Sequence, residues 1–328
     1  MSNYTSFPHM HSNFLTNRVT QIVLSTFVFI SGYFIGNKKI LFNFKDLFNF
    51  YKKRIIRIYP LYIVSVYLFM ILKLSDPITL FKAGALLSMF IKPVPPTLWF
   101  VTMLFLFYMI SPILIYASRK FNKTRLVIYY LFFISLLIAY SDATNLLDIR
   151  IAIYFPLFAS GVFVANSNSI YKSKSNCTLK EILTMSICFL FSFLPTPDEP
   201  IYVLKFIPMM LSCSYSLFRS AEQLDISSKL LRKIIITLSY SSYCMYLFHR
   251  PIYTLLKGVY FPKLFLYEIG YLLLFCLPCI LCCSFIIQKL YDVTIDTLAN
   301  QYDPEHTKSQ TNSEPSTAAR ATNTRSSR

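Results

Sequence analysis

Long apolar runs alternate with short polar segments along most of this chain. The longer runs reach the length at which a helix crosses the roughly 30 Å hydrocarbon core of a bilayer, which takes about 20 residues. Because lipid offers the backbone no hydrogen-bond partners, such runs are expected to be helical. The pattern predicts an all-α integral membrane protein, a polytopic bundle of about nine to ten transmembrane helices. The clearest runs are residues 19–36, 55–70, 97–116, 126–140, 151–165, 182–194, 201–217, 234–253 and 264–287.

One further apolar run is not expected to cross the bilayer. Residues 78–91 carry Lys82 and end in the proline-rich segment 93–96. At about fourteen residues the run is below the length needed to cross a bilayer. We therefore predict an interfacial or re-entrant element here rather than a crossing.

The two ends of the chain are polar, and clusters of Lys and Arg orient what lies between them. Residues 1–18 are too polar to cross a membrane, and residues 19–290 are expected to form one membrane domain. Residues 291–328 are predicted to be a tail that is disordered from about residue 304 because it cannot bury a core. Cytoplasmic loops carry an excess of Lys and Arg. The positions of the basic clusters therefore predict an N-terminus outside and a cytoplasmic C-terminus.

Composition supports a membrane protein and argues against nucleic-acid binding. The 328 residues are 55% hydrophobic and 14% charged, with a mean hydropathy of +0.50, outside the range of an ordinary soluble domain. The net charge of +17 comes from short basic clusters between apolar runs rather than from a basic face on a soluble fold. The expected partner of this charge is the lipid bilayer, and no nucleic acid is expected.

The cysteines indicate packing rather than a disulfide framework or a metal site. All of them except Cys177 lie inside apolar runs, so no disulfide framework is implied. Residues 276–283 contain four cysteines with no histidine or carboxylate beside them. Free cysteine behaves as a small buried hydrophobe, and this cluster is interpreted as packing. Glu268 in the same run is a lone acid that could pair with Lys263 or be solvated, and its role is left open.

A basic cluster runs directly into the second apolar segment. Arg54 and Arg57 are three residues apart, so they share one face of a helix, and Arg57 lies about one turn inside the apolar run. An arginine in hydrocarbon is costly, and a functional role is the default hypothesis for Arg57. The simpler alternative is a side chain that reaches back to the lipid headgroups, which we favour for Lys52 and Lys53.

A polar stripe follows the helix predicted at residues 234–253. Ser239, Ser242, Tyr246 and His249 are separated by three, four and three residues. These spacings put all four side chains on one face of an otherwise apolar helix. The stripe either positions a substrate or makes structural hydrogen bonds to a neighbouring helix, and the pattern does not decide between these roles.

Five short segments, taken together and in order, resemble the acyltransferase-3 family of multi-pass membrane acyltransferases. Singly each is a weak match, but their order along the chain makes the set more specific. The segments are 29–34 (FISGYF), 53–60 (KRIIRIYP), 98–100 (LWF) followed by Tyr108 and Pro112, 158–161 (FASG) and 242–251 (SYCMYLFHRP).

The resemblance implies transfer of an acyl group, usually acetyl from acetyl-CoA, to a hydroxyl of a glycan in the bacterial cell envelope. It implies no bound cofactor, with acyl-CoA as the co-substrate, and an inner-membrane location. Because CoA is polyanionic and enters from the cytoplasm, Arg54 and Arg57 are the expected donor-binding residues. Ser242, Tyr246 and His249 are expected to contact the acceptor or to be structural.

The family also places a histidine at the end of its first span, and His11 is the best match for it. Its expected role is general base, taking the proton from the acceptor hydroxyl. The helix that should precede His11 is not found in residues 1–10, so a missing first helix is expected, with residues 1–18 as the remnant of its end. Arg54 and Arg57 are expected at the inner face and both His11 and His249 toward the outer one. This separation could approach the roughly 30 Å core, so either the acyl-pantetheine arm threads between helices or re-entrant segments bring the histidines inward.

Two other functions fit part of the sequence. A polytopic transporter or flippase of a glycan or anionic substrate would also use intramembrane Arg and His. An inactive, truncated relative of the acyltransferases would explain the missing first helix. Transfer of label from acetyl-CoA to glycan separates the enzyme from both alternatives.

Overall fold

The fold is described from a computed structural model of the chain. The structure describes residues 14–38, 42–144, 146–166, 179–194, 205–262 and 265–302. Within these ranges the regular structure is entirely helical, which confirms the predicted all-α class. His11 and the segment predicted to be disordered from about residue 304 lie outside the described residues.

A helix is found at each of the nine predicted runs, and several extend further than the apolar pattern. The second begins at Phe44 rather than near residue 55, and the last continues to Tyr302, past residue 290. The elements are α1 (Phe14–Gly36), α2 (Phe44–Ile71), α3 (Pro77–Gly84), α4 (Leu98–Lys120), α5 (Lys123–Thr144), α6 (Arg150–Asn166), α7 (Leu179–Phe191), α9 (Phe206–Gln223), α10 (Lys229–Val259), α11 (Phe265–Tyr271), the π-helical turn η2 (Leu272–Cys276) and α12 (Leu277–Tyr302).

Within the described ranges, four helical segments are both long enough and apolar enough to cross a membrane. They are Thr16–Gly36, Phe44–Ile71, Leu98–Lys120 and Tyr267–Thr297. Ile128–Thr144 and Arg150–Asn166 are apolar but shorter. The 13 residues of α7 rise only about 20 Å, less than the thickness of the hydrocarbon core. The described helices are compatible with the predicted polytopic membrane bundle.

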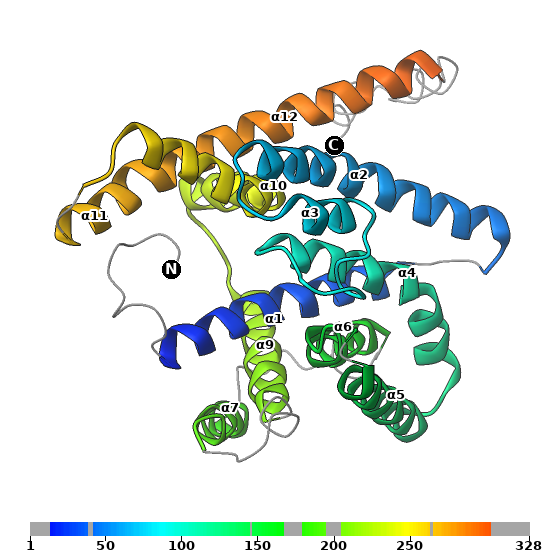
Figure 1. The fold of residues 1–328 in the computed structure, drawn as a ribbon. Helices are drawn as coiled ribbons and strands as arrows, with labels where there is room; N and C mark the ends of the chain where they lie inside the picture. The colour runs from blue at the N-terminus through cyan, green and yellow to red at the C-terminus, as the bar shows by residue number, and fades with distance from the viewer. Residues whose placement is uncertain are drawn as a thin grey trace, which may run out of the picture.

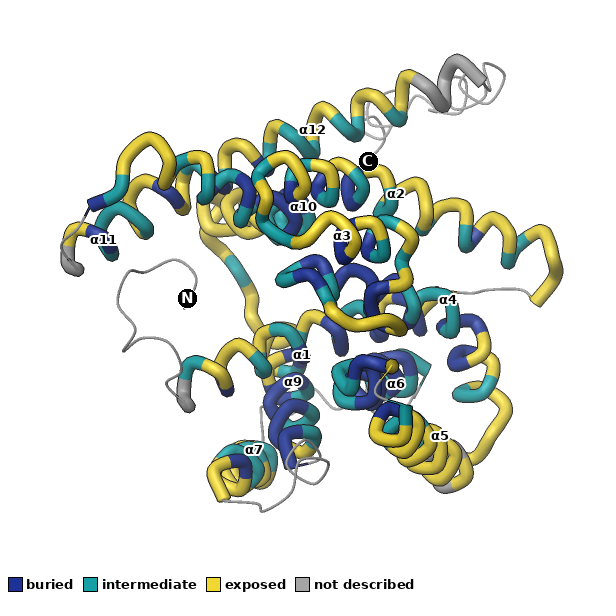
Figure 2. The backbone as a smooth tube through the Cα atoms, viewed as in Figure 1, coloured by how far each residue is buried: buried dark blue, intermediate teal, exposed yellow. Residues whose placement is uncertain are grey.

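The helices form two groups with α1 and α4 between them (Figure 1). One group contains α2, α3, α10, α11 and α12, and the other contains α5, α6, α7 and α9. Buried residues concentrate in α4, α6 and α9, whereas α5 and α12 present mostly exposed residues (Figure 2). The exposed residues of α12 include Ile286, Leu290 and Val293, which are apolar side chains suited to lipid.

The contact between α1 and α6 is made through glycines. A Cβ atom on Gly32 would lie 2.2 Å from the carbonyl oxygen of Phe158, and one on Gly161 would lie 2.1 Å from that of Phe29. The absence of a side chain at each glycine therefore lets the backbone of the other helix pack directly against it. Close approach through small residues is how helices gain packing in lipid, where the hydrophobic effect between helices is absent. Two of the five family-like segments, 29–34 and 158–161, meet at this contact.

In the run at residues 78–91 the α-helix α3 has only eight residues, too short to cross a bilayer. Asp76 accepts hydrogen bonds from the backbone N–H groups of Ile78 and Thr79, and this caps the start of the eight-residue α3. The last carbonyls of a helix lack partners within it. Here α2 supplies them, because the Tyr62 hydroxyl donates to the carbonyl of Ala83 at 3.0 Å and Tyr59 donates to Gly84 at 3.0 Å.

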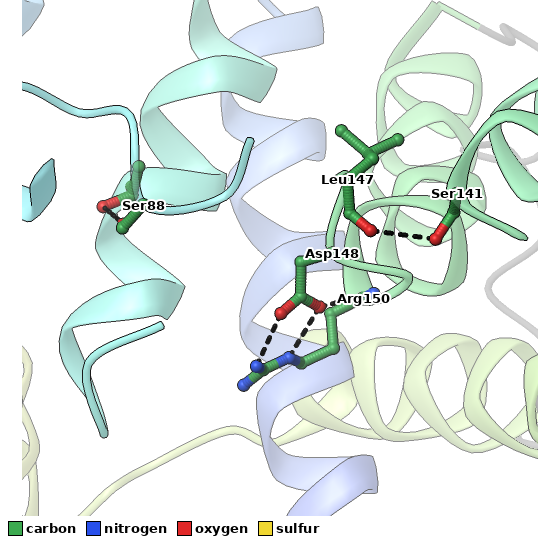
Figure 3. Close-up of polar contacts among 6 residues, drawn as sticks. Ser88, Ser141, Leu147, Asp148 and Arg150 are labelled. Carbon is green, nitrogen blue, oxygen red and sulfur yellow. Dashed lines mark hydrogen bonds and ion pairs between the residues drawn. The ribbon is translucent and has the colours of Figure 1, made fainter. Parts of the chain in front are cut away.

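An ion pair fixes the start of α6 (Figure 3). The Asp148 carboxylate accepts hydrogen bonds from Nε and Nη2 of Arg150 at 2.8 and 2.6 Å, and from the Arg150 backbone N–H at 3.0 Å. The Asp148 N–H donates to the carbonyl of Met89 at 2.9 Å, and the guanidinium of Arg150 lies 4.3 Å from the Trp99 ring centre. The pair thus joins the start of α6 to the segment after α3 and to α4.

Asp148→Asn should lower the free energy of unfolding by about 1–2 kcal/mol. Asparagine removes the charge from a buried carboxylate that accepts three hydrogen bonds, and the exposed third of the Arg150 side chain limits the loss. The midpoint of thermal unfolding in detergent measures this change. Asp142→Asn is the control, since Asp142 is exposed in the same region. Equal midpoints for the two variants would contradict a structural role for the ion pair.

Candidate functional site

A cavity of about 1250 Å³ lies between α1 and α4 on one side and α2, α10 and α12 on the other. Its walls come from α1, α2, α4, α10, the π-helical turn and α12. Concave sites with mostly apolar walls and a few convergent polar groups are the usual form of a ligand site. The cavity is lined by five of the six residues that the sequence singled out: Arg54, Arg57, Ser242, Tyr246 and His249.

One part of the cavity wall is strongly basic. Lys53, Arg54 and Arg57 of α2 line it, so the two arginines do share one face of the helix. The Arg54 guanidinium carbon lies 5.4 Å from the centre of the Tyr108 ring and 5.5 Å from that of Phe50. These aromatic faces hold Arg54 in place by cation–π attraction. Arg57 is the more exposed of the two and is open to the cavity.

Lys38 adds a fourth cation to this basic wall. It was not among the residues predicted from the sequence to bind the donor. Burial lowers the pKa of Lys38 from its ordinary value, and the positive charge of Arg54 lowers it further. Lys53 and Arg57 act in the same direction. The wall therefore holds like charges close enough to disfavour one another, and a bound polyanion would relieve that repulsion. The position of Lys38, two residues after the end of α1, is the signal that could have identified it.

Two carboxylates of α12, also missed from the sequence, line the same cavity. They belong to Asp292 and Asp296. Asp292 accepts a hydrogen bond from the Tyr240 hydroxyl and another from Gln288 Nε2 at 3.0 Å. Both lie beyond residue 290, where the apolar pattern fades, although α12 itself continues. The cavity is therefore bordered by cations from α2 and acids from α12.

The polar stripe of α10 also lines the cavity, and the hydroxyls of Ser242 and Tyr246 are hydrogen-bonded. Ser242 Oγ donates to the carbonyl of Ser239 at 2.8 Å within the helix. The Tyr246 hydroxyl donates to the carbonyl of Thr97 at 2.7 Å, at the start of α4. Ser242 and Tyr246 thus make structural hydrogen bonds on the surface of the cavity.

His249 has its tautomer fixed by a backbone carbonyl. Its Nδ1 lies 2.7 Å from the carbonyl oxygen of Tyr246, and a carbonyl oxygen can only accept, so Nδ1 carries the proton. In the neutral ring the lone pair is then on Nε2. This arrangement suits an imidazole that takes up a proton at Nε2 while Nδ1 stays hydrogen-bonded.

The arginines and His249 line the same cavity. The Tyr243 hydroxyl of α10 donates to the carbonyl of Ile58, next to Arg57, at 2.8 Å. His249 is six residues further along α10, a rise of about 9 Å. The contact of Tyr243 with Ile58 thus brings the α10 segment before His249 beside the turn of α2 that carries Arg57. His11 lies outside the described residues.

The comparison with protein families decides what kind of protein holds this cavity. The acyltransferase-3 family model, Acyl_transf_3, described as an acyltransferase domain, matches residues 1–287. This chain belongs to the acyltransferase-3 family. Neither a curated protein nor a solved structure matches the chain. The acyltransferase identity and the spanning helices agree that this is a membrane protein.

The family-like segments of this acyltransferase have two different jobs in the fold. Segments 29–34 and 158–161 bring α1 and α6 into backbone contact, and segment 29–34 also contributes Ser31 and Phe34 to the cavity wall. Segments 53–60 and 242–251 supply cavity walls, including both arginines and His249. The segment at 98–100 contributes Phe100 to the cavity, while Trp99 contacts Arg150.

Proposed function

We propose that this membrane acyltransferase transfers an acyl group, acetyl in the first instance, from acyl-CoA to a hydroxyl of a cell-envelope carbohydrate. The carbohydrate is a polysaccharide or a lipid-linked glycan at a bacterial inner membrane. The observation that carries the proposal is that one cavity joins a wall of four cations to a histidine whose proton is on Nδ1. The first feature suits a polyanionic donor and the second suits proton transfer from a hydroxyl.

The basic wall is assigned to the phosphates of CoA. Guanidinium groups bind phosphate through two parallel hydrogen bonds, and Lys adds point charge. The excess of Lys and Arg in the segments beside α2 supports a cytoplasmic opening, where acyl-CoA is available, and a cytoplasmic C-terminus. On this orientation α2 and α10 both run outward, in keeping with the contacts of Ile58 with Tyr243 and of Ser65 with Leu247.

The reaction forms one ester bond and breaks one thioester bond. The acceptor hydroxyl oxygen attacks the thioester carbonyl carbon while a histidine takes the hydroxyl proton, and the thiolate of CoA leaves and receives a proton. His11 is proposed as this general base on the family resemblance. His249, with Ser242 and Tyr246, is proposed to position the acceptor, and its Nε2 makes it the competing candidate for the base.

Labelled acetyl-CoA supplied to membranes that contain the protein tests the proposal. We expect transfer of label to glycan, and loss of transfer in the variant that removes the base. His11→Ala and His249→Ala are compared in the same preparation, each with a measurement of acetyl-CoA affinity, so that loss of the base is separated from loss of donor binding. Glycan export without any transfer of label would contradict the proposal and support a transporter.

A further inference from the structure

Three helices that line the cavity, α2, α4 and α10, contain an internal proline. Pro60 lies inside α2 and Pro251 lies inside α10. Proline has no N–H, so the carbonyl four residues earlier in the helix loses its partner. The affected carbonyls belong to Ile56 in α2 and to Leu247 in α10. In lipid such a carbonyl must find another donor, and neighbouring helices or hydroxyl side chains supply one.

Both carbonyls are satisfied by a hydroxyl from a different helix. The Tyr291 hydroxyl of α12 donates to the carbonyl of Ile56. Ser65 Oγ of α2 donates to the carbonyl of Leu247 at 3.0 Å. In α4 the equivalent gap is closed within the helix, because Ser111 Oγ donates to the carbonyl of Tyr108, four residues before Pro112, at 2.7 Å. In α2 and α10, by contrast, the carbonyl that proline leaves without a partner accepts a hydrogen bond that joins two helices.

The gap in α2 lies next to the donor-site arginine. Ile56 immediately precedes Arg57, and Tyr291 lines the same cavity as both arginines. On the other side of Arg57, the carbonyl of Ile58 accepts from Tyr243 of α10 at 2.8 Å. The backbone on both sides of Arg57 is thus hydrogen-bonded to side chains of other helices. This fixes the rotation of α2 at the turn that carries Arg57.

We propose that Tyr291 is a positioning residue for the acyl-CoA site. By donating to the carbonyl that Pro60 leaves without a partner, it holds the turn of α2 from which Arg57 reaches the donor phosphates. The inference rests on the proposed function, since it assumes that Arg57 binds the donor. Tyr291 itself does not contact the reacting atoms in this assignment.

A double-mutant cycle tests this role. Tyr291→Phe removes only the hydroxyl, and Pro60→Ala restores the N–H that Ile56 would use within the helix. We expect Tyr291→Phe to raise the KM for acetyl-CoA by about fivefold with a smaller change in kcat, as for the loss of one hydrogen bond that orients a binding group. In the Pro60→Ala background the same change should leave KM nearly unaltered, because the carbonyl then has its own partner.

Ser65→Ala is the matched control, because it leaves the equivalent proline gap in α10 open without touching the turn of Arg57. It should not raise the KM for acetyl-CoA by the factor seen for Tyr291→Phe. If Tyr291→Phe alone folds poorly, the KM for acetyl-CoA is compared between Pro60→Ala and the double variant Pro60→Ala, Tyr291→Phe. A fivefold difference between these two proteins would overturn the proposal. An unchanged KM in Tyr291→Phe would overturn it as well. Full affinity in Arg57→Ala would instead overturn the donor site itself, so the two failures are distinguishable.

Discussion

Replacing Arg57 by lysine should weaken acyl-CoA binding by about tenfold to a hundredfold while the protein remains folded. Lysine keeps the positive charge but loses the planar fork that binds phosphate through two hydrogen bonds. Hydrogen bonds to charged groups contribute about 1.5–3 kcal/mol, which corresponds to this range of affinity. Folding should be preserved because Arg57 is exposed to the cavity rather than buried.

Titration calorimetry of purified protein with acetyl-CoA measures the effect of Arg57→Lys. Lys52→Ala is the control, since Lys52 is exposed on the same helix and does not line the cavity. Lys52→Ala removes a full charge, yet it should change the affinity for acetyl-CoA less than Arg57→Lys, which keeps the charge. If Arg57→Lys binds acetyl-CoA as tightly as the unaltered protein, Arg57 does not belong to the donor site.

Much of the fold could be predicted because lipid restricts the choices of the chain. Every apolar run had to be helical, and a helix is found at each run. The close approach of another helix at Gly32 was also predictable, since small residues mark helix contacts in membranes. The shared face of Arg54 and Arg57 followed from helical spacing alone, and the cavity contains both.

Other features of the site could not be predicted because hydropathy marks contact with lipid, not the ends of helices. The start of α2, which Asn43 caps, and the polar end of α12 at Tyr302 are helical although the apolar pattern does not extend to them. Asp292 therefore fell in the predicted tail, although it accepts hydrogen bonds on the cavity wall. Tyr291 was missed for the same reason, together with its bond to Ile56.

The position of His249 relative to the arginines could not be predicted from the sequence either. Topology assigned it to the outer side, which implied a long path from the arginines. The contact between Tyr243 and Ile58 sets the register of α10 against α2, and such a register depends on tertiary packing that no local pattern encodes. Once the register is known, six residues of α10 separate His249 from the level of Arg57.

The largest loss of stability is expected from Gly161→Ala. The added Cβ would lie 2.1 Å from the carbonyl oxygen of Phe29 and 2.8 Å from the backbone nitrogen of Tyr33. Backbone atoms in the middle of a helix cannot rotate away, so α1 and α6 must separate. Overpacking commonly costs about 1–3 kcal/mol and sometimes more, and we expect about 3 kcal/mol or more here. The yield of monodisperse protein and its thermal midpoint in detergent measure the loss.

Gly258→Ala makes the same chemical change where a Cβ meets nothing within 4 Å. Alanine is favoured over glycine inside a helix by about 1 kcal/mol, so this variant of α10 should be as stable as the original protein or more so. Equal behaviour of the two variants would show that α1 and α6 are not packed through their backbones. A destabilised Gly161→Ala should also lose acyl transfer, because α1 carries Ser31 of the cavity wall and leads into Lys38. Loss of both stability and acyl transfer would show that the glycine contact between α1 and α6 is needed to hold the basic wall in place.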